Sequence, residues 1–131
     1  MKNLDDERER LRILETYSIV GTSPETEYDN ITKIASEISQ SPLAQINIID
    51  ETNQYSKSSL GIPYNIIPRE FAFCNHTIQN PFELTVVPDM RLDERFQNHP
   101  AVMGEPHIQF YAGVPLTTPE GFALGSLCVM D

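Results

Sequence analysis

Cys74 and His76 are the residues whose types could carry nucleophilic or redox chemistry. A thiol beside an imidazole can lose its proton and attack an electrophile. Residues two positions apart on a helix point to different sides, however, so the pair would not meet there. The favoured interpretation of Cys74 is therefore a small buried apolar residue. A thiol-dependent redox enzyme or sensor that uses Cys74 stays open as the alternative.

Metal-ligating side chains are scattered along the chain and form no recognisable motif. The candidates are Cys74, His76, His99, His107 and Cys128. None of them is paired at the spacing of a zinc or iron site, and Cys128 falls in an apolar segment. Two cysteines without a C-x-x-C spacing are also too few for a disulfide framework, so both are expected to be free thiols. With no Gly-x-Ser-x-Gly elbow and no Gly-rich phosphate loop, the sequence predicts no catalytic or metal site and names no cofactor.

Charged residues of alternating sign occupy one short segment, namely Asp89, Arg91, Asp93 and Arg95. The favoured interpretation is a salt-bridged loop that holds a short helix against a sheet. The alternative directs Arg91 towards an anionic ligand, to which its guanidinium would offer a fork of donors. Arg91 is therefore kept as a candidate binding residue at the rim of a pocket.

Length and composition predict one folded unit and exclude several partners. With 131 residues, 40% of them hydrophobic, the chain is large enough for one core and too short for two. Its 19 acidic and 9 basic residues give a net charge of -10, which opposes binding to nucleic acid or to an anionic membrane. No apolar stretch approaches the length of a membrane span, and the N-terminus lacks the apolar core of a secretory signal. A cytoplasmic location is therefore expected.

The first expected helix covers residues 4–17, which are rich in helix formers and acidic in the first turn. Leu4, Leu11 and Leu14 fall close to one narrow apolar stripe. A stripe of this kind often pairs with another helix, so a homodimer through the N-terminal helix is expected.

A second helix is expected to begin near Thr22 or Ser23, with Pro24 in its first turn, and to end at Ser41. Its apolar residues recur at helical spacing and are expected to lie flat on a sheet; they are Tyr28, Ile31, Ile34, Ala35 and Ile38.

The residues at 43–50 predict a strand with two unlike faces. Ala44, Ile46 and Ile48 point to one side and suit a layer of helices. Gln45 and Asn47 point to the other side, where each needs a polar partner. That second side is the expected location of a pocket.

Short strands and short helices alternate through the rest of the chain. The expected elements are a polar edge strand (54–60), a Pro-containing loop (61–68), a short helix (71–79), a strand (84–87), a second short helix (93–98) and two core strands (108–116 and 122–130). The two core strands flank a turn-forming stretch and predict an antiparallel hairpin at the centre of the sheet.

Six segments in a fixed order carry a resemblance to a known family: 10–14, 73–78, 87–89, 93–96, 110–116 and 124–131. Together they resemble a GAF domain, of the type found at the N-terminus of bacterial sensor histidine kinases and diguanylate cyclases. The resemblance implies an α+β fold over residues 1–131, with a central antiparallel sheet and the long N-terminal helices on one face. On the other face it implies short helices and loops over a pocket. Family members normally continue past the position of Asp131 into a long C-terminal helix, which this chain lacks.

The resemblance implies a regulatory or sensory module that is not itself an enzyme and that signals through helix packing. A fused histidine kinase or diguanylate cyclase output in a longer protein would be the partner. GAF-type methionine sulfoxide reductases use a different cysteine pattern, and bilin-binding members place His directly after Cys, where Asn75 intervenes here. The alternative to a sensor is a ligand-free dimerisation domain.

An unknown small molecule is the expected ligand, in a pocket between the sheet and the segments 69–79 and 89–99. The expected ligand-binding residues are Gln45, Asn47, Tyr55, Phe73, Cys74, His76, Arg91 and Tyr111. Polar ligands are expected to be preferred over flat apolar ones, because buried Gln45 and Asn47 need hydrogen-bond partners.

Overall fold

Strand β1 (Leu43–Ile49) lies near the middle of a six-stranded sheet in the computed structural model, which describes residues 4–131. The order across the sheet is β3-β2-β1-β6-β5-β4, and all neighbouring strands are antiparallel. The other strands are β2 (Asn53–Leu60), β3 (Ile66–Pro68), β4 (Thr85–Val87), β5 (Tyr111–Thr117) and β6 (Ala123–Met130). The hairpin predicted from the last two apolar runs is confirmed as β5 and β6.

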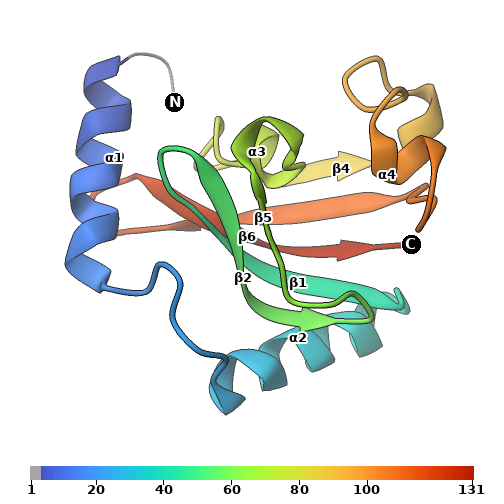
Figure 1. Ribbon diagram of the computed structural model, residues 1–131, viewed down its shortest axis with the longest axis horizontal. Helices are drawn as coiled ribbons and strands as arrows, with labels where there is room; N and C mark the ends of the chain where they lie inside the picture. Colours follow the sequence, from blue (N-terminus) through green and yellow to red (C-terminus); the bar gives the residue numbers. More distant parts are fainter. Residues whose placement is uncertain (1–3) are drawn as a thin grey trace.

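Helices cover both faces of the sheet (Figure 1). The long helix α2 (Thr26–Ser39) lies along one face, and α1 (Leu4–Tyr17) stands at the end of the sheet where β1 finishes and β6 begins. The short elements on the other face are η1 (Arg69–Phe71), α3 (Cys74–Thr77), η2 (Met90–Leu92) and α4 (Pro100–Met103). We call residues 69–79 and 89–103 the lid. The predicted α+β class is confirmed, and no helix within residues 4–131 is long and apolar enough to cross a bilayer.

The two faces of β1 differ as the sequence predicts. Ile48 is buried against Ile13 and Leu14 of α1, which places the apolar face on the side of the long helices. Gln45 and Asn47 are both buried on the lid side. The alternation of β1 therefore separates an apolar helix layer from a polar layer beneath the lid.

Strand β6 approaches β1 unusually closely at Gly125. In the register, Gly125 lies opposite Ile48 and Ser126 lies opposite Asn47. A Cβ atom at position 125 would lie 1.9 Å from the backbone oxygen of Asn47, so only glycine fits. This approach brings the side chains of Ser126 and Cys128 up to the polar residues of β1.

Helix α1 packs its inner side on the sheet through Ile13 and Leu14. Leu14 is 3% exposed, whereas Leu4 is 74% exposed. The expected dimer stripe of Leu4, Leu11 and Leu14 is therefore not a free face, because Leu14 belongs to the core of this chain. The expected homodimer itself stays a prediction.

Helix α2 begins later than predicted, at Thr26 with Glu25 as N-cap. Thr22 cannot cap it because the Thr22 hydroxyl donates to the carbonyl oxygen of Ile19 and accepts from Lys57. The prediction that the isoleucines of α2 lie on the sheet is also wrong. Ile31, Ile34 and Ile38 are 45%, 54% and 80% exposed.

Polar residues of α2 face the sheet because α2 lies over the polar strand β2. Thr32 is buried, and its Oγ1 lies 2.8 Å from Oγ of Ser58 in β2. The Ser58 hydroxyl in turn donates to Oδ1 of Asp29 at 2.6 Å. These hydrogen bonds fix the rotation of α2 and turn the apolar stripe outward.

The lid and the sheet edge differ from the sequence prediction in three places. The helix expected at 71–79 is divided into η1 and α3. The helix expected at 93–98 is a run of turns, because the Asp93 carboxylate accepts from the backbone N–H of Arg95; the helix forms instead at α4, where His99 caps Ala101. The edge next to β2 is β3, so β2 is not the edge strand over its first three residues.

Candidate functional site

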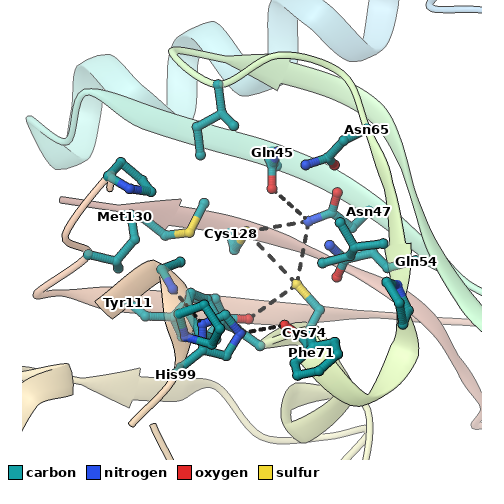
Figure 2. A pocket seen from close by; sticks show the side chains of 18 of the residues that line it. Gln45, Asn47, Gln54, Asn65, Phe71, Cys74, His99, Tyr111, Cys128 and Met130 are labelled. Carbon is teal, nitrogen blue, oxygen red and sulfur yellow. Dashed lines mark hydrogen bonds between the residues drawn. The ribbon is translucent and has the colours of Figure 1, made fainter. Parts of the chain in front are cut away.

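A cavity of about 390 Å³ lies between the sheet and the lid. Its buried polar residues come from neighbouring strands and from α3; they are Gln45, Asn47, Gln54, Cys74, Tyr111 and Cys128. The remainder of the wall is mainly apolar, with Phe71, Phe73, His99 and Met130 among its residues. Figure 2 shows Asn47 and Cys74 side by side, with Gln54 on the same side of the cavity. The cavity therefore has mainly apolar walls, and we call its buried polar residues the polar floor.

Hydrogen bonds fix the orientation of the Asn47 amide. The Ser59 hydroxyl donates to the carbonyl oxygen of Ile62, so it accepts from Nε2 of Gln45, at 3.1 Å. Oε1 of Gln45 consequently faces Asn47 and accepts from its Nδ2, also at 3.1 Å. Because a backbone carbonyl starts this chain of bonds, the Asn47 amide cannot flip without losing one of them.

Two amide oxygens of the polar floor have no hydrogen-bond partner among residues 4–131. They are Oδ1 of Asn47 and Oε1 of Gln54, on side chains that are 1% and 5% exposed. A buried acceptor without a partner costs about 1–3 kcal/mol. The floor therefore offers acceptors to a molecule that brings hydrogen-bond donors.

The two thiols meet at the same floor, although 54 positions separate them in the sequence. Sγ of Cys74 lies 3.9 Å from Sγ of Cys128, and both are free cysteines. Sγ of Cys74 accepts from Ser126 Oγ at 2.8 Å, from Tyr111 Oη at 3.4 Å and from Asn47 Nδ2 at 3.6 Å. Both cysteines were expected to be free, but their proximity was not expected.

The surroundings give the two thiols opposite acidities. The hydrogen bond from Cys128, followed by those from Ser126, Tyr111 and Asn47, lowers the pKa of Cys74 to about 6 despite burial. Donation to Cys74, burial and the charge of Cys74 raise the pKa of Cys128. Burial first, and then the two thiols, raise the pKa of Tyr111, so its hydroxyl stays a donor. The pair is arranged to hold one thiolate, on Cys74, and one thiol.

Five of the expected ligand-binding residues line the cavity: Gln45, Asn47, Phe73, Cys74 and Tyr111. Tyr55 does not, because it pairs with Ile48 on the helix side of the sheet, and its hydroxyl donates to Asp50 at 2.9 Å. The inward residue of β2 is its neighbour Gln54, which the sequence reasoning missed. The pairing of Gln54 with Ile49 shows the correct side, since Ile49 belongs to the core beneath the lid.

His76 and Arg91 also lie outside the cavity lining. The ring of His76 packs edge-on against Phe96 at 4.8 Å, and burial, followed by the charge of Arg95, lowers its pKa. Arg91 is exposed and pairs with Asp89 at 2.8 Å, as Arg95 pairs with Asp93. The ion pairs of the favoured interpretation are therefore present, but the short helix that they were expected to hold against the sheet is instead a run of turns. Whether any of these residues binds a ligand stays a prediction.

A partly buried group of ion pairs connects the lid to α1 and was not foreseen. Arg10 is 0% exposed and donates to the carbonyl oxygens of Ile49 at 2.8 Å and Ala123 at 3.3 Å. Its partner Glu7 also accepts from Arg69 of the lid at 2.6 Å. Arg69 donates in turn to Oδ1 of Asn75, the residue next to Cys74, at 2.8 Å.

Metal ligands do not gather in the described part of the chain. Among residues 4–131, no three His, Cys, Asp or Glu side chains come together in a group that could hold a metal ion. The side-chain groups that line the cavity include amides, thiols and aromatic rings.

The comparisons with known proteins agree with this architecture. Residues 23–131 match the family model of the GAF domain. The chain is 38% identical over 129 residues to a cyclic di-GMP phosphodiesterase of Pseudomonas aeruginosa. That match covers 97% of this chain and 22% of the relative, so the chain spans about a fifth of the length of that protein.

Solved structures share the fold at low sequence identity. The GAF domain of an Acinetobacter phosphoenolpyruvate-protein phosphotransferase superposes with a TM-score of 0.65 at 16% identity, over 100% of this chain and 78% of that one. A type II free methionine-R-sulfoxide reductase of Thermoplasma acidophilum gives 0.65 at 10% identity, over 90% of this chain and 77% of that one. With the family match over residues 23–131 and the six-stranded sheet beneath its lid, this chain belongs to the GAF domain family.

Proposed function

We propose that this domain is a regulatory module that binds a small molecule in the cavity between the sheet and the lid. The observation that carries the proposal is the free Oδ1 of Asn47, a buried acceptor on a residue that lines the cavity, whose amide orientation the Gln45 and Ser59 hydrogen bonds fix. Nδ2 of Asn47 has partners in Gln45 and Cys74 but Oδ1 has none, and a ligand that donates to Oδ1 would remove this cost.

The cavity supports a particular class of ligand. A volume of about 390 Å³ suits a compact ring system. Its apolar walls favour a flat or apolar body, and the free oxygens of Asn47 and Gln54 favour N–H or O–H donors on that body. The ligand is therefore a small ring compound with at least one donor.

The effect of ligand binding would reach helix α1 through the lid. A ligand beneath α3 and η1 bears on the segment that carries Cys74, Asn75 and Arg69. Arg69 shares the Glu7 carboxylate with Arg10, so a shift of the lid changes the ion pairs of α1. A ligand that binds one lid position more tightly than another would then bias the position of α1.

Matched pairs of small compounds test the binding proposal. Benzamide with N,N-dimethylbenzamide, and indole with 1-methylindole, differ only in whether they carry an N–H donor. We expect the donor-bearing member of each pair to shift backbone amide signals of β1 and α3 in ¹⁵N spectra at concentrations where its methylated partner does not. Equal binding of both members would contradict the role of Asn47.

Two matched variants show whether the compounds bind in the cavity or elsewhere on the surface. Asn47→Leu keeps the approximate volume but removes the acceptor, so it should abolish the preference for the donor-bearing compounds. Asn30→Leu, at an exposed position of α2 on the opposite face, should retain it. Absence of binding by every compound to the wild-type chain would favour the alternative of a ligand-free dimerisation domain.

We propose further that the domain regulates an output domain of a longer signalling protein, as the match to part of a cyclic di-GMP phosphodiesterase supports. A phosphodiesterase is one candidate output, beside the histidine kinase and the diguanylate cyclase that the family resemblance implies. The gene sequence beyond Asp131 tests this, and a gene that encodes no signalling domain would count against it. Where an output is encoded, Asn47→Leu in the full-length protein should alter its regulation but not its basal turnover.

A further inference from the structure

The cavity floor holds a pair of thiols in an arrangement that the binding proposal does not use. Cys74 comes from the lid and Cys128 from the central strand β6, and both sulfur atoms face the cavity (Figure 2). Their separation of 3.9 Å exceeds a disulfide bond of about 2.05 Å by only about 1.9 Å. Each side chain is 1% exposed, so the pair is reached through the cavity.

The hydrogen bonds around the sulfur atoms give the two cysteines different roles, with Cys74 as the nucleophile and Cys128 as the second thiol of the disulfide. Three donors point at Sγ of Cys74, from Ser126, Tyr111 and Asn47. The Thr77 hydroxyl lies 2.7 Å from Tyr111 Oη and can donate to it, which leaves the Tyr111 proton for Cys74. Donors aimed at a sulfur stabilise its thiolate. Cys128, in contrast, lies 3.9 Å from Sγ of Cys74 and has a raised pKa, which favours a proton on Cys128.

We propose that Cys74 and Cys128 form an oxidisable dithiol, which a small hydroperoxide converts into an intramolecular disulfide between the lid and the sheet. The Cys74 thiolate attacks one oxygen of hydrogen peroxide, the O–O bond breaks, and the leaving hydroxide takes a proton to become water. The sulfur of Cys128 then attacks the Cys74 sulfenic acid, and hydroxide leaves from sulfur with the Cys128 proton as a second water. Two thiols lose two electrons, and one peroxide is reduced to two waters.

Formation of this bond would move the lid. The sulfur atoms must approach by about 1.9 Å. Cys74 lies at the first position of α3, which has only four residues, so α3 moves more easily than the central strand β6. Asn75 would move with it, and Asn75 accepts from Arg69 at 2.8 Å. Oxidation of the pair thus acts on the same ion pairs of α1 without any ligand in the cavity.

Mass spectrometry of the purified reduced domain tests the proposal directly. With a few equivalents of hydrogen peroxide at neutral pH, we expect the intact mass to fall by about 2 Da and both free thiols to disappear. A non-reducing peptide map should then contain the crosslink between Cys74 and Cys128, and dithiothreitol should reverse it. Oxygen addition at Cys74 without a loss of 2 Da, crosslinks only between molecules, or two thiols that persist would each overturn the proposal.

Variants separate the roles of the two thiols. Cys128→Ser should stop the reaction at a Cys74 sulfenic acid that dimedone traps, whereas Cys74→Ser should give no dimedone adduct. Ser126→Ala removes one donor to Cys74, so we expect oxidation at pH 6 to slow by up to about fivefold, because a pKa one unit above about 6 lowers the thiolate fraction at that pH by that factor. If the serine variants fail to fold, the wild-type peptide map still decides the outcome, and none of these readouts requires a ligand.

Discussion

Arg10 provides the sharpest test of what holds α1 to the sheet. Its side chain is 0% exposed, and its guanidinium donates to the backbone oxygens at the ends of β1 and β6. Arg10→Met keeps a long side chain but removes two buried hydrogen bonds from a charged donor, each worth about 1.5–3 kcal/mol. The apolar methionine recovers part of this by filling the same space, and Glu7 keeps its second partner, Arg69. We expect a net loss of about 3 kcal/mol in the free energy of unfolding, near the lower bound for breaking a buried ion pair.

Urea unfolding followed by far-ultraviolet circular dichroism measures this loss. With an m-value of about 1–3 kcal/mol per M, the midpoint should fall by about 1–3 M. Arg12→Met is the matched control, because Arg12 lies two residues along the same helix and pairs with Glu9 at the surface. The control should unfold at the wild-type midpoint. The reasoning is refuted if the two variants unfold at the same urea concentration.

Three further predictions concern the same framework. Burial would raise the pKa of Glu7, but Arg10 and Arg69 lower it. The stability that the Glu7 carboxylate contributes should therefore be lost as the pH falls below 4.5 towards this lowered pKa. Urea unfolding in this pH range should show a smaller loss of stability with falling pH for Glu7→Gln than for the wild type. Gly125→Ala should cost more than about 3 kcal/mol or prevent folding, since backbone atoms block the new Cβ, whereas Gly21→Ala, with open space around a positive φ, should cost about 1 kcal/mol. Arg91→Ala should leave both the melting temperature and the binding of indole unchanged, because the side chain is exposed and outside the cavity.

The alternation within β1 was predictable because it depends only on the geometry of one strand. Once Ala44, Ile46 and Ile48 face the helices, Gln45 and Asn47 must face the lid. It was harder to predict which side chains of β2 face the lid, because a register shift between Ile46 and Asn47 changes the pairing of β2 with β1. Such an irregularity has no local sequence signal, so the sequence of this strand does not show that Gln54, and not Tyr55, faces the cavity.

Features that join distant segments escaped prediction for a related reason. The approach of Cys74 to Cys128 depends on which strands are neighbours in the sheet and on where the lid crosses it. The exposure of Ile31 and Ile34 depends on the polar character of β2 beneath α2. Arg10 did carry a usable signal, since it precedes Ile13 and Leu14 by three and four residues and therefore shares their inner face.

Arg10 and Arg69 share the Glu7 carboxylate, and the strength of the pair between Arg69 and Glu7 sets the free energy that a cavity ligand needs to change the contacts of α1. A cavity occupant can pull Arg69 away from Glu7 only with the free energy by which it prefers the displaced lid, and a tenfold preference supplies about 1.4 kcal/mol. One hydrogen bond to a charged group is worth about 1.5–3 kcal/mol. Arg69 donates two such hydrogen bonds to Glu7, at 2.6 and 3.4 Å, so an occupant needs a preference of at least about a hundredfold to separate this pair. Arg10 keeps α1 anchored to the ends of β1 and β6 throughout.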